Sequence, residues 1–385
     1  MKTKKTFGII VALFFVTVFL INFNLNQQGI CKFSAYANAN NTAKSMIVME
    51  TLHDRTLYSK NQFEKLPMAS TTKIVTALTV IENVEDLDKT IKIPKRATLV
   101  EGSSIYLKEN EELTIRQLLY GLMLQSGNDA ALSLALEVGE NSLEKFAQMM
   151  NETAKKCGAN DSNFVTPHGL DDKNHYTTAY DLAKITSYAL KNETFKEIVS
   201  TKSYKIQSSE NTTARTLINK NKLLSSLEGC IGVKTGYTSR AGRCLVSACQ
   251  RGDMQVVCVV LNCRPMFEES IDLINRAFDE YKMCEILPRY KCISDISVEN
   301  GKSSSVKIYN KNGYYVVEKE NNLDKYSVIY NYPKNVKAPI KKDDVMGTLE
   351  IYYDKNLIFT ENLCSIENVE TLDSNDKLKE ILDKW

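Results

Sequence analysis

Residues 67–78 read P-M-A-S-T-T-K-I-V-T-A-L, and this stretch predicts the start of a helix that carries two reactive side chains. Apolar residues recur at helical spacing after Lys73, so we expect a helix over residues 70–83 with Ser70 in its first turn. Lys73 would lie on the same face, one turn later. Because free backbone N–H groups and the helix dipole favour negative charge at a helix start, a serine can be activated at this position.

The Ser-x-x-Lys spacing carries little information by itself. The same spacing occurs at three other places, Ser142/Lys145, Ser304/Lys307 and Ser374/Lys377. At least some of these matches arise by chance, so the interpretation of Ser70 depends on the patterns that accompany it.

A second predicted helix is interrupted by a short polar tripeptide. Thr114 is a typical helix cap, and apolar residues follow it at helical spacing. The pattern breaks at Ser126-Gly127-Asn128 and resumes from Asp129. The break therefore places a hydroxyl group and an amide group on a short loop between two apolar helices.

A third pattern, Lys234-Thr235-Gly236, ends a strand-like run and is the only K-T-G in the sequence. A lysine supplies positive charge, and a threonine hydroxyl can hold a carboxylate. A glycine lets a substrate backbone lie close to the strand edge. These residue types in this order indicate a binding strand for a substrate that carries a carboxylate.

The order and spacing of the three patterns form a much stronger signal than any one of them. Ser126 follows Ser70 by 56 residues, and Lys234 follows Ser126 by 108 residues. The arrangement resembles the low-molecular-mass penicillin-binding proteins, specifically the D-alanyl-D-alanine carboxypeptidases. The resemblance extends over roughly residues 40–285 and includes the stretches 67–78, 121–131, 164–172, 175–183 and 232–238. Residues 337–347 match the carboxy-terminal domain of that family more loosely.

The resemblance implies a serine peptidase that removes the terminal D-alanine from peptidoglycan stem pentapeptides through an acyl-enzyme. Ser70 would attack the carbonyl group of the penultimate D-alanine, and Lys73, neutral in the resting site, would take its proton. Ser126 would pass a proton to the departing D-alanine, and Asn128 would hold Lys73 or the substrate amide. β-Lactam antibiotics would inhibit such an enzyme.

The substrate-binding residues that the resemblance implies are Lys234, Thr235, Gly236, Tyr237 and Lys220. Thr235 would bind the terminal carboxylate, and the backbone N–H groups of Ser70 and Tyr237 would form the oxyanion hole. Lys234 would help to keep Lys73 neutral, because a second cation nearby disfavours protonation. Lys220 stands where the family often has an arginine, so it supplies charge without the bidentate fork of a guanidinium group.

The chain is predicted to fold as an α/β domain of the penicillin-binding protein and β-lactamase type, with an antiparallel sheet flanked by helices and a helical subdomain. A small all-β domain follows it. Strand-like runs joined by tight turns, with helical runs inserted between them, favour this architecture. The expected strands are 45–50, 56–59, 231–235, 243–248 and 254–261, and later helices are expected at 178–190 and 271–281. We expect a signal peptide over 1–39, a catalytic domain over 40–286, a β domain over 287–370 and an amphipathic tail helix over 371–385.

The sequences at both ends of the chain indicate where the protein is located. Three lysines precede an apolar run over residues 7–21, which is typical of an export signal. Cleavage is expected near Ala37 or Ala39, and an uncleaved anchor is the alternative. Residues 374–385 place apolar side chains on one helical face, which favours either a peripheral membrane contact or a packed terminus. We expect an extracytoplasmic protein that is secreted or associated with the cell envelope.

Composition bears on partners and cofactors. Residues 1–39 hold four lysines and no acid, so with a chain charge of +2 the remainder carries −2, which argues against nucleic acid. The nine cysteines after Cys31 are odd in number, include no C-x-x-C pair and lie partly in apolar runs. We therefore expect small buried hydrophobes rather than disulfides, with no structural zinc site. Serine acyl transfer needs no cofactor, and none is expected.

Three rival interpretations are open. A β-lactamase shares the three patterns, but its middle one is usually Ser-Asp-Asn and a loop glutamate drives deacylation, whereas residues 168–172 here read H-G-L-D-D. A penicillin sensor or peptidoglycan-binding protein would be acylated and would turn over slowly. His168 and His175 could belong to a Ser/His/Asp triad, yet the sequence has no G-x-S-x-G, and a histidine in a turn is more often structural.

Overall fold

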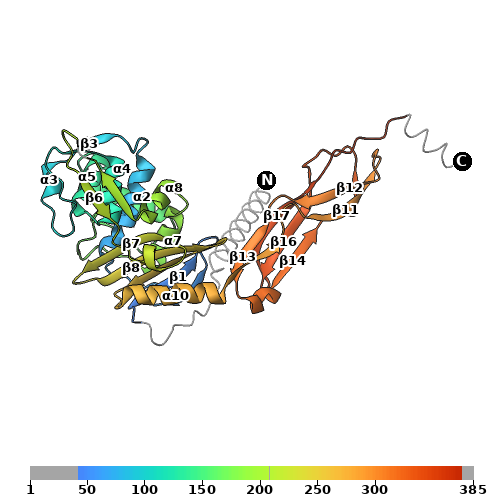
Figure 1. The fold of residues 1–385 in the computed structure, drawn as a ribbon. Coiled ribbons are helices and arrows are strands. Elements are labelled where there is room, and N and C mark those ends of the chain that lie inside the picture. The colour runs from blue at the N-terminus through green and yellow to red at the C-terminus, as the bar shows by residue number, and fades with distance from the viewer. Residues whose placement is uncertain (1–41, 208, 375–385) are drawn as a thin grey trace, which may run out of the picture. The chain divides into compact units, whose positions relative to one another are not determined.

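A five-stranded antiparallel sheet forms the centre of the larger folded part of the protein (Figure 1). The computed structural model describes residues 42–207 and 209–374. The strand order is β2-β1-β9-β8-β7, and every neighbouring pair is antiparallel. The strands are β1 (Ser45–Glu50), β2 (Thr56–Lys60), β7 (Cys230–Thr238), β8 (Gly242–Arg251) and β9 (Met254–Leu261). The predicted early hairpin and three later strands therefore meet in one sheet.

Residues on the central strands alternate between two apolar layers, one on each face of the sheet. On β1, Ile47 and Met49 belong to one buried cluster, whereas Met46 and Val48 belong to the other. The covering helices are α2 (Lys73–Asn83), α7 (Ala179–Ala189) and α10 (Met266–Glu280). Helix α10 covers the face of Met46 and Val48, and α2 and α7 contribute to the opposite layer (Figure 1). Because both faces are buried, these strands read as nearly continuous apolar runs.

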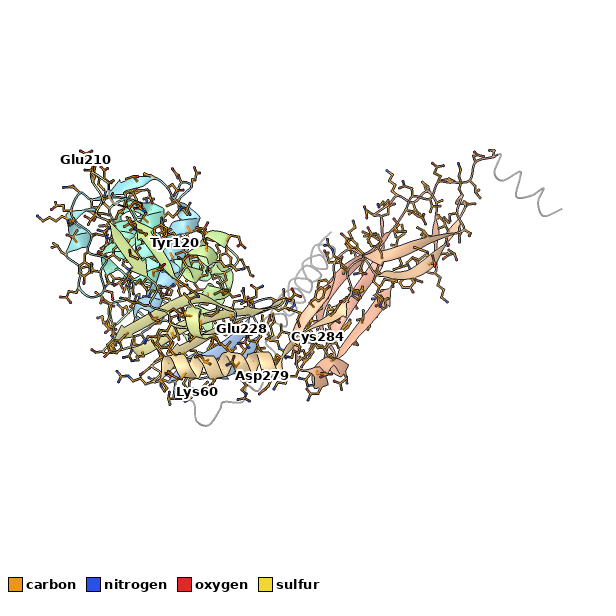
Figure 2. The ribbon with its side chains drawn as sticks, viewed as in Figure 1. Lys60, Tyr120, Glu210, Glu228, Asp279 and Cys284 are labelled. Atoms are coloured by element: carbon orange, nitrogen blue, oxygen red, sulfur yellow. The ribbon has the colours of Figure 1, made fainter. Side chains whose placement is uncertain are left out.

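A helical subdomain is formed by the chain between β2 and β7. Its longer helices are α4 (Ile115–Leu124), α5 (Asn128–Val138), α6 (Leu143–Lys156) and α8 (Glu193–Ser200). Shorter elements are β3 (Thr90–Lys92), α3 (Lys95–Thr98), β4 (Glu112–Thr114), β5 (Ser203–Ile206), β6 (Arg215–Ile218) and α9 (Leu223–Ser226). Tyr120 of α4 stacks on Tyr204 of β5 with ring centroids 3.8 Å apart, and its hydroxyl donates to Glu197 of α8 at 2.9 Å (Figure 2). This contact holds the β5–β6 hairpin against α4.

Helix starts follow the predicted caps. Thr114 and Gln117 form a reciprocal capping box at the start of α4, with hydrogen bonds of 3.1 and 2.9 Å. The Thr178 side chain caps α7 through a single hydrogen bond, which it accepts from the backbone N–H of Asp181. The interruption predicted at residues 126–128 is also present, because α4 and α5 are separate helices on either side of it.

Ser70 lies in the first helical turn as predicted, but that turn is a 3-10 turn and not part of the α-helix that follows. Residues Ala69–Thr72 form a 3-10 helix, and α2 begins only at Lys73. Each of the two threonine hydroxyls in this turn donates to the carbonyl oxygen three residues earlier, at 2.7 and 2.8 Å. These local bonds compete with the α-helical pattern and tighten the turn. Ser70 therefore lies on a short, tightly wound turn directly before the helix.

The described chain after α10 is almost entirely β structure. Six strands form one sheet in the order β14-β16-β17-β12-β11-β15, and β10 pairs with β13 in a two-stranded sheet. The strands are β10 (Lys282–Leu287), β11 (Cys292–Glu299), β12 (Ser305–Asn310), β13 (Tyr314–Glu318), β14 (Tyr326–Asn331), β15 (Asn335–Lys337), β16 (Val345–Tyr353) and β17 (Asn356–Ser365). This part has its own apolar core, which includes Ile308, Leu349 and Leu363. The predicted fold class is therefore confirmed.

Some strands of this β part carry too few apolar residues to be recognised from the sequence. Strands β11 and β17 read C-I-S-D-I-S-V-E and N-L-I-F-T-E-N-L-C-S, in which polar and charged residues are frequent. Pairing with neighbouring strands, rather than their own composition, makes them strands. The boundary predicted after residue 286 falls inside β10, and the domain boundaries stay predictions.

The expectations about the two ends of the chain concern residues outside the described range. The signal peptide lies within residues 1–39, and the tail helix lies almost entirely beyond residue 374. In the part of the chain that is described, no helix combines the length and the apolar character that crossing a bilayer requires. Cleavage, anchoring and membrane contact therefore stay predictions.

Candidate active site

The side chain of Lys73 is at the centre of a buried polar cluster. Its Nζ atom lies 3.0 Å from Ser70 Oγ, 2.7 Å from Asn128 Oδ1 and 2.7 Å from the carbonyl oxygen of His168. Lys73 itself has no solvent exposure. Ser70 precedes α2, Asn128 begins α5 and His168 lies in the loop before α7, so three distant segments of the sequence meet here.

Two lysines of this site have depressed pKa values. Burial lowers the pKa of Lys73 well below its ordinary value, and the neighbouring cations Lys234 and Lys220 lower it further, while Asp129 acts in the opposite direction. Burial also lowers the pKa of Lys234 to about 7, with Lys220 as the second cause. Lys234 is therefore partly neutral near neutral pH, and burial and neighbouring cations favour the neutral form of Lys73 over its charged form.

Strand β7 runs directly past the turn that carries Ser70. A Cβ atom added at Gly236 would lie 3.0 Å from the backbone nitrogen of Ser70 and 3.0 Å from the carbonyl oxygen of Met68. These distances are tighter than ordinary Cβ contacts, so a larger residue would displace the turn. Glycine at this position therefore lets the Lys-Thr-Gly strand lie against the N–H group of Ser70.

Lys234 and Tyr237 lie on β7, and Ser126 lies directly before α5. Lys234 is buried and donates to the carbonyl oxygen of Thr235 at 2.9 Å, and Tyr237 is 55% exposed. Ser126 is buried two residues before Asn128, and its φ of +63° is a left-handed conformation that costs a non-glycine residue about 1 kcal/mol. Backbone strain of this kind is often retained at functional sites.

Asn128 and Asp129 also hold a neighbouring loop that the sequence did not assign to the site. The Asn128 side-chain amide donates to the Glu101 carbonyl oxygen at 2.6 Å, and its backbone N–H donates to that of Ser103 at 2.7 Å. The buried Asp129 carboxylate accepts two backbone N–H groups of residues 105–107, each at 3.1 Å, and a hydroxyl of the same loop at 2.6 Å. An acid in the first turn of a helix is common for electrostatic reasons, so its residue type gives no signal of this second function.

Comparisons with known proteins agree with this arrangement. The D-alanyl-D-alanine carboxypeptidase family matches residues 32–264, and the C-terminal domain of penicillin-binding protein 5 matches residues 281–371. The chain belongs to the D-alanyl-D-alanine carboxypeptidase family. It is a serine-type hydrolase of the low-molecular-mass penicillin-binding protein class. This family acts on peptidoglycan of the cell envelope, which implies D-Ala-D-Ala substrates and binding of β-lactams.

Relatives and solved structures cover most of this carboxypeptidase. The D-alanyl-D-alanine carboxypeptidase DacF of Bacillus subtilis is 29% identical over 89% of this chain and 90% of its own length. The D-alanyl-D-alanine carboxypeptidase DacC of Escherichia coli is 31% identical over 85% of this chain and 84% of its own length. Penicillin-binding protein 5 of Haemophilus influenzae matches with a TM-score of 0.70 and 26% identity, over 87% of this chain and 100% of that one. The Streptomyces K15 DD-transpeptidase matches with a TM-score of 0.60 and 33% identity, over 63% of this chain and 100% of that one.

The two histidines of the carboxypeptidase near this site have surroundings that favour a structural interpretation. His175 is buried, with Nε2 2.8 Å from the Thr72 hydroxyl and Nδ1 accepting the Val165 backbone N–H at 3.0 Å. Burial lowers the pKa of His175 to about 4 and that of His168 to about 3. Both rings are therefore neutral near neutral pH, and His168 meets Lys73 through its backbone carbonyl group.

Lys220 lies at the edge of the carboxypeptidase site. Its Nζ atom is 3.5 Å from Ser103 Oγ, and partial burial lowers its pKa. Arg240 and Arg243 are exposed, and the Arg243 guanidinium lies over the Tyr237 ring, 5.6 Å from the ring centroid. Lys220 is therefore close enough to lower the pKa of the two buried lysines, whereas the two arginines lie on the surface.

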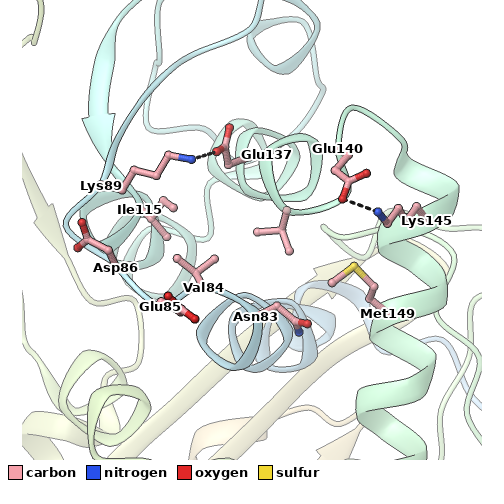
Figure 3. A pocket seen from close by; sticks show the side chains of 11 residues that line it. Asn83, Val84, Glu85, Asp86, Lys89, Ile115, Glu137, Glu140, Lys145 and Met149 are labelled. Atoms are coloured by element: carbon pink, nitrogen blue, oxygen red, sulfur yellow. Dashed lines mark hydrogen bonds and ion pairs between the residues drawn. The ribbon is translucent and has the colours of Figure 1, made fainter.

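A separate cavity with a volume of about 530 Å³ contains none of these residues (Figure 3). It is lined by residues at the ends of α2 and α5 and by the side of α6. Four of its charged side chains form two ion pairs, Lys89 with Glu137 at 2.8 Å and Lys145 with Glu140 at 2.7 Å. Cavity size alone therefore does not identify the active site of this carboxypeptidase.

The described residues include no group of three or more histidine, cysteine or acidic side chains that could hold a metal ion. The nine cysteines between residues 157 and 364 are free thiols.

Proposed function

We propose that Ser70 is the nucleophile and Lys73 the general base of this D-Ala-D-Ala carboxypeptidase. The observation that carries the proposal is the contact, at 3.0 Å, between the Ser70 hydroxyl and a fully buried lysine whose pKa is depressed. Ser70 would attack the carbonyl group of the penultimate D-alanine, and the bond to the last D-alanine would break. Water would then release the peptide from the acyl-enzyme.

The partners of Lys73 support this direction of proton transfer. A neutral amine has two N–H groups and one lone pair. Asn128 Oδ1 and the His168 carbonyl oxygen can only accept, so they take the two N–H groups. The lone pair then faces the Ser70 hydroxyl, which can donate its proton. A protonated Lys73 would have no lone pair to offer, so the depressed pKa permits the step.

The backbone of β7 supports an oxyanion hole at Ser70. The close approach that Gly236 allows brings the strand against the Ser70 backbone nitrogen. We assign the N–H groups of Ser70 and Tyr237 as the two donors to the developing negative charge. Each donor of this kind lowers the barrier by about 3 kcal/mol.

The neighbouring lysines and hydroxyls would bind the end of the substrate. The Thr235 hydroxyl and the charge of Lys234 would hold the terminal carboxylate. Lys220 would add a point charge, which fixes a carboxylate less firmly than the fork of an arginine. Ser126 would pass a proton to the departing D-alanine, and no cofactor takes part in these steps.

We further propose which substrate and inhibitors this enzyme binds and where it works. The substrate would be the stem pentapeptide of peptidoglycan, and β-lactams would inhibit the enzyme by acylating Ser70. The protein would be exported through its amino-terminal signal and would work outside the cytoplasm. The amphipathic tail would add a peripheral membrane contact. The charge balance after residue 39 supports the absence of a nucleic-acid partner.

A penicillin-sensing or peptidoglycan-binding protein that turns over slowly is the second candidate, and a β-lactamase is the third. The third is disfavoured by one contact, because the group that the 164–172 loop presents to Lys73 is a backbone carbonyl and not a glutamate side chain. The second differs from a carboxypeptidase only in the rate of deacylation. A measurement of turnover therefore separates them.

The proposal is tested by the release of free D-alanine from a short peptide that ends in D-Ala-D-Ala, with residues 40–385 as the enzyme. Ser70→Ala is expected to reduce release by about 10⁴-fold or more, because the residual activity without a nucleophile is small. Ser142→Ala is the matched control, since Ser142 also precedes a lysine by three residues but caps α6 on the surface. Acylation by penicillin without D-alanine release would favour the sensor, and undiminished release by Ser70→Ala would contradict the assignment.

A further inference from the structure

Two free thiols face each other across the strands β7 and β8. Cys230 and Cys249 are register partners in this antiparallel pair, and neither belongs to a disulfide. Partners of this kind have Cα atoms about 4.5 or 5.5 Å apart, which lies inside the range that a disulfide spans. The pairing of the strands therefore places the two cysteines opposite each other, and the register shifts directly after Cys230.

The two sulfur atoms are already in contact and differ in accessibility. The Cys249 S–H donates a hydrogen bond to the Cys230 sulfur, which lowers the pKa of Cys230 and raises that of Cys249. Cys249 has no solvent exposure and belongs to the apolar layer under α10, whereas Cys230 is only partly buried. A small reagent can therefore reach Cys230 first, with Cys249 next to it as the second thiol.

The other described cysteines lack this arrangement. Cys258 faces Ser247 across the β8–β9 pair, and Cys244 faces Gly236 across the β7–β8 pair. Cys284 on β10 faces Val316. Among the strand pairs of the described residues, Cys230 and Cys249 form the one pair of opposed cysteines. Two thiols directly opposite each other are therefore particular to this position among those strand pairs.

We propose that Cys230 and Cys249 form a redox modification site, which a small-molecule disulfide oxidises to a cross-strand disulfide bond. The Cys230 thiolate attacks one sulfur of the reagent, forms a mixed disulfide and releases one thiol. Cys249 then loses its proton and attacks the Cys230 sulfur, which releases the second thiol. Two protein thiols are oxidised in total, and one reagent disulfide is reduced to two thiols.

The cross-link would stabilise the strand that carries the Lys-Thr-Gly residues. Cys230 is the first residue of β7, and Lys234 follows on the same strand. A disulfide here closes a loop through the β7–β8 turn and removes conformational freedom from the unfolded chain. The oxidised protein is therefore more resistant to heat than the reduced protein. This inference does not depend on the catalytic roles proposed above.

The test uses the protein over residues 40–385, which is reduced, freed of reductant and then treated with oxidised glutathione. Peptide mapping without reduction is expected to find a peptide pair linked through Cys230 and Cys249. The melting temperature is expected to rise by about 5 °C and to return to its starting value with dithiothreitol. Cys284→Ala removes a partly exposed thiol elsewhere. This control variant is expected to give the same linked peptide pair and the same rise in melting temperature as the wild type.

Two single variants and one labelling experiment distinguish a disulfide between Cys230 and Cys249 from a mixed disulfide or two free thiols. Cys230→Ala and Cys249→Ala are each expected to lose the linked peptide and the rise in melting temperature. Differential alkylation of the wild-type protein gives an answer even if a variant fails to fold, because it reads the state of each thiol directly. A stable mixed disulfide at Cys230 with a free Cys249, or two free thiols after treatment, would overturn the proposal.

Discussion

Lys73 and Lys145 each follow a serine by three residues, yet their surroundings are opposite. Lys145 is exposed and pairs with Glu140 at 2.7 Å, so its charge is stabilised. Lys73 is buried against two oxygen atoms that can only accept and one hydroxyl. At the scale of the residue, the environment and not the spacing separates a base from an ordinary surface cation.

Lys73→Arg is expected to slow acylation by a penicillin by about 10³-fold, because a guanidinium cannot lose its proton near neutral pH and so cannot act as a base. The rate is measured by stopped-flow or gel detection of a fluorescent penicillin on the purified protein. Lys145→Arg is the matched control and is expected to acylate at the rate of the wild type. Normal acylation by Lys73→Arg would mean that the neutral amine is not the proton acceptor.

The start of α5 organises the site at the scale of the element. Asn128 contacts Lys73 on one side and the 101–103 loop on the other. Asp129, the next residue, holds residues 105–107 through buried backbone N–H groups. One helical turn therefore positions a catalytic contact and the loop beside it together.

Asp129→Ala is expected to lower the free energy of unfolding by about 3 kcal/mol, because two buried backbone N–H groups lose their acceptor. The change is measured by urea denaturation at neutral pH. D-alanine release is expected to fall as well. Asn128, which contacts Lys73, is hydrogen-bonded to residues 101 and 103 of the same loop, so a displaced loop would disturb that contact. Glu137→Ala on the same helix removes only an exposed ion pair with Lys89 and is expected to change stability by less than about 1 kcal/mol. Equal effects of the two variants would refute this account of Asp129.

The whole molecule is destabilised by burying two lysines in its active site. Lys234 has a folded-state pKa of about 7, below its ordinary value. Below about pH 7, Lys234 is protonated in both the folded and the unfolded protein, and burying its charge lowers the free energy of unfolding by the full amount. Between that pH and the ordinary lysine pKa of about 10.4, the unfolded chain binds a proton that the folded protein does not. The contribution of Lys234 to stability therefore rises with pH through this window.

Lys234→Met is expected to raise the free energy of unfolding by a few kcal/mol at about pH 6 and to raise it much less at about pH 10, since methionine has a similar volume and no charge. Urea denaturation of both proteins at a series of pH values gives the difference. The same variant is expected to lose substrate affinity, because the proposed carboxylate contact is removed. A stability difference that does not depend on pH would show that the buried charge is not its source.

Much of the fold follows from periodicity and caps that are readable in the sequence. The apolar runs of β1 and β9 and the caps at Thr114 and Thr178 predict elements that the structure contains. The turn at Ser70 is different, because threonine side chains that bond to local carbonyl groups override the helical pattern. Strands β11 and β17 are also different, since their pairing partners, and not their own residues, decide their conformation.

The sequence by itself determined which residues could do chemistry and in what order they occur. Ser70, Lys73, Ser126, Asn128 and the Lys-Thr-Gly strand are recognisable as a set because residue type and spacing are local properties. Only the tertiary structure decided the state of those groups. Burial and the closeness of Lys234 and Lys220 lower the pKa of Lys73, and the segments that bury it and supply these cations are far apart in the chain. Desolvation and hydrogen bonding act through space, so no pattern along the sequence contains them.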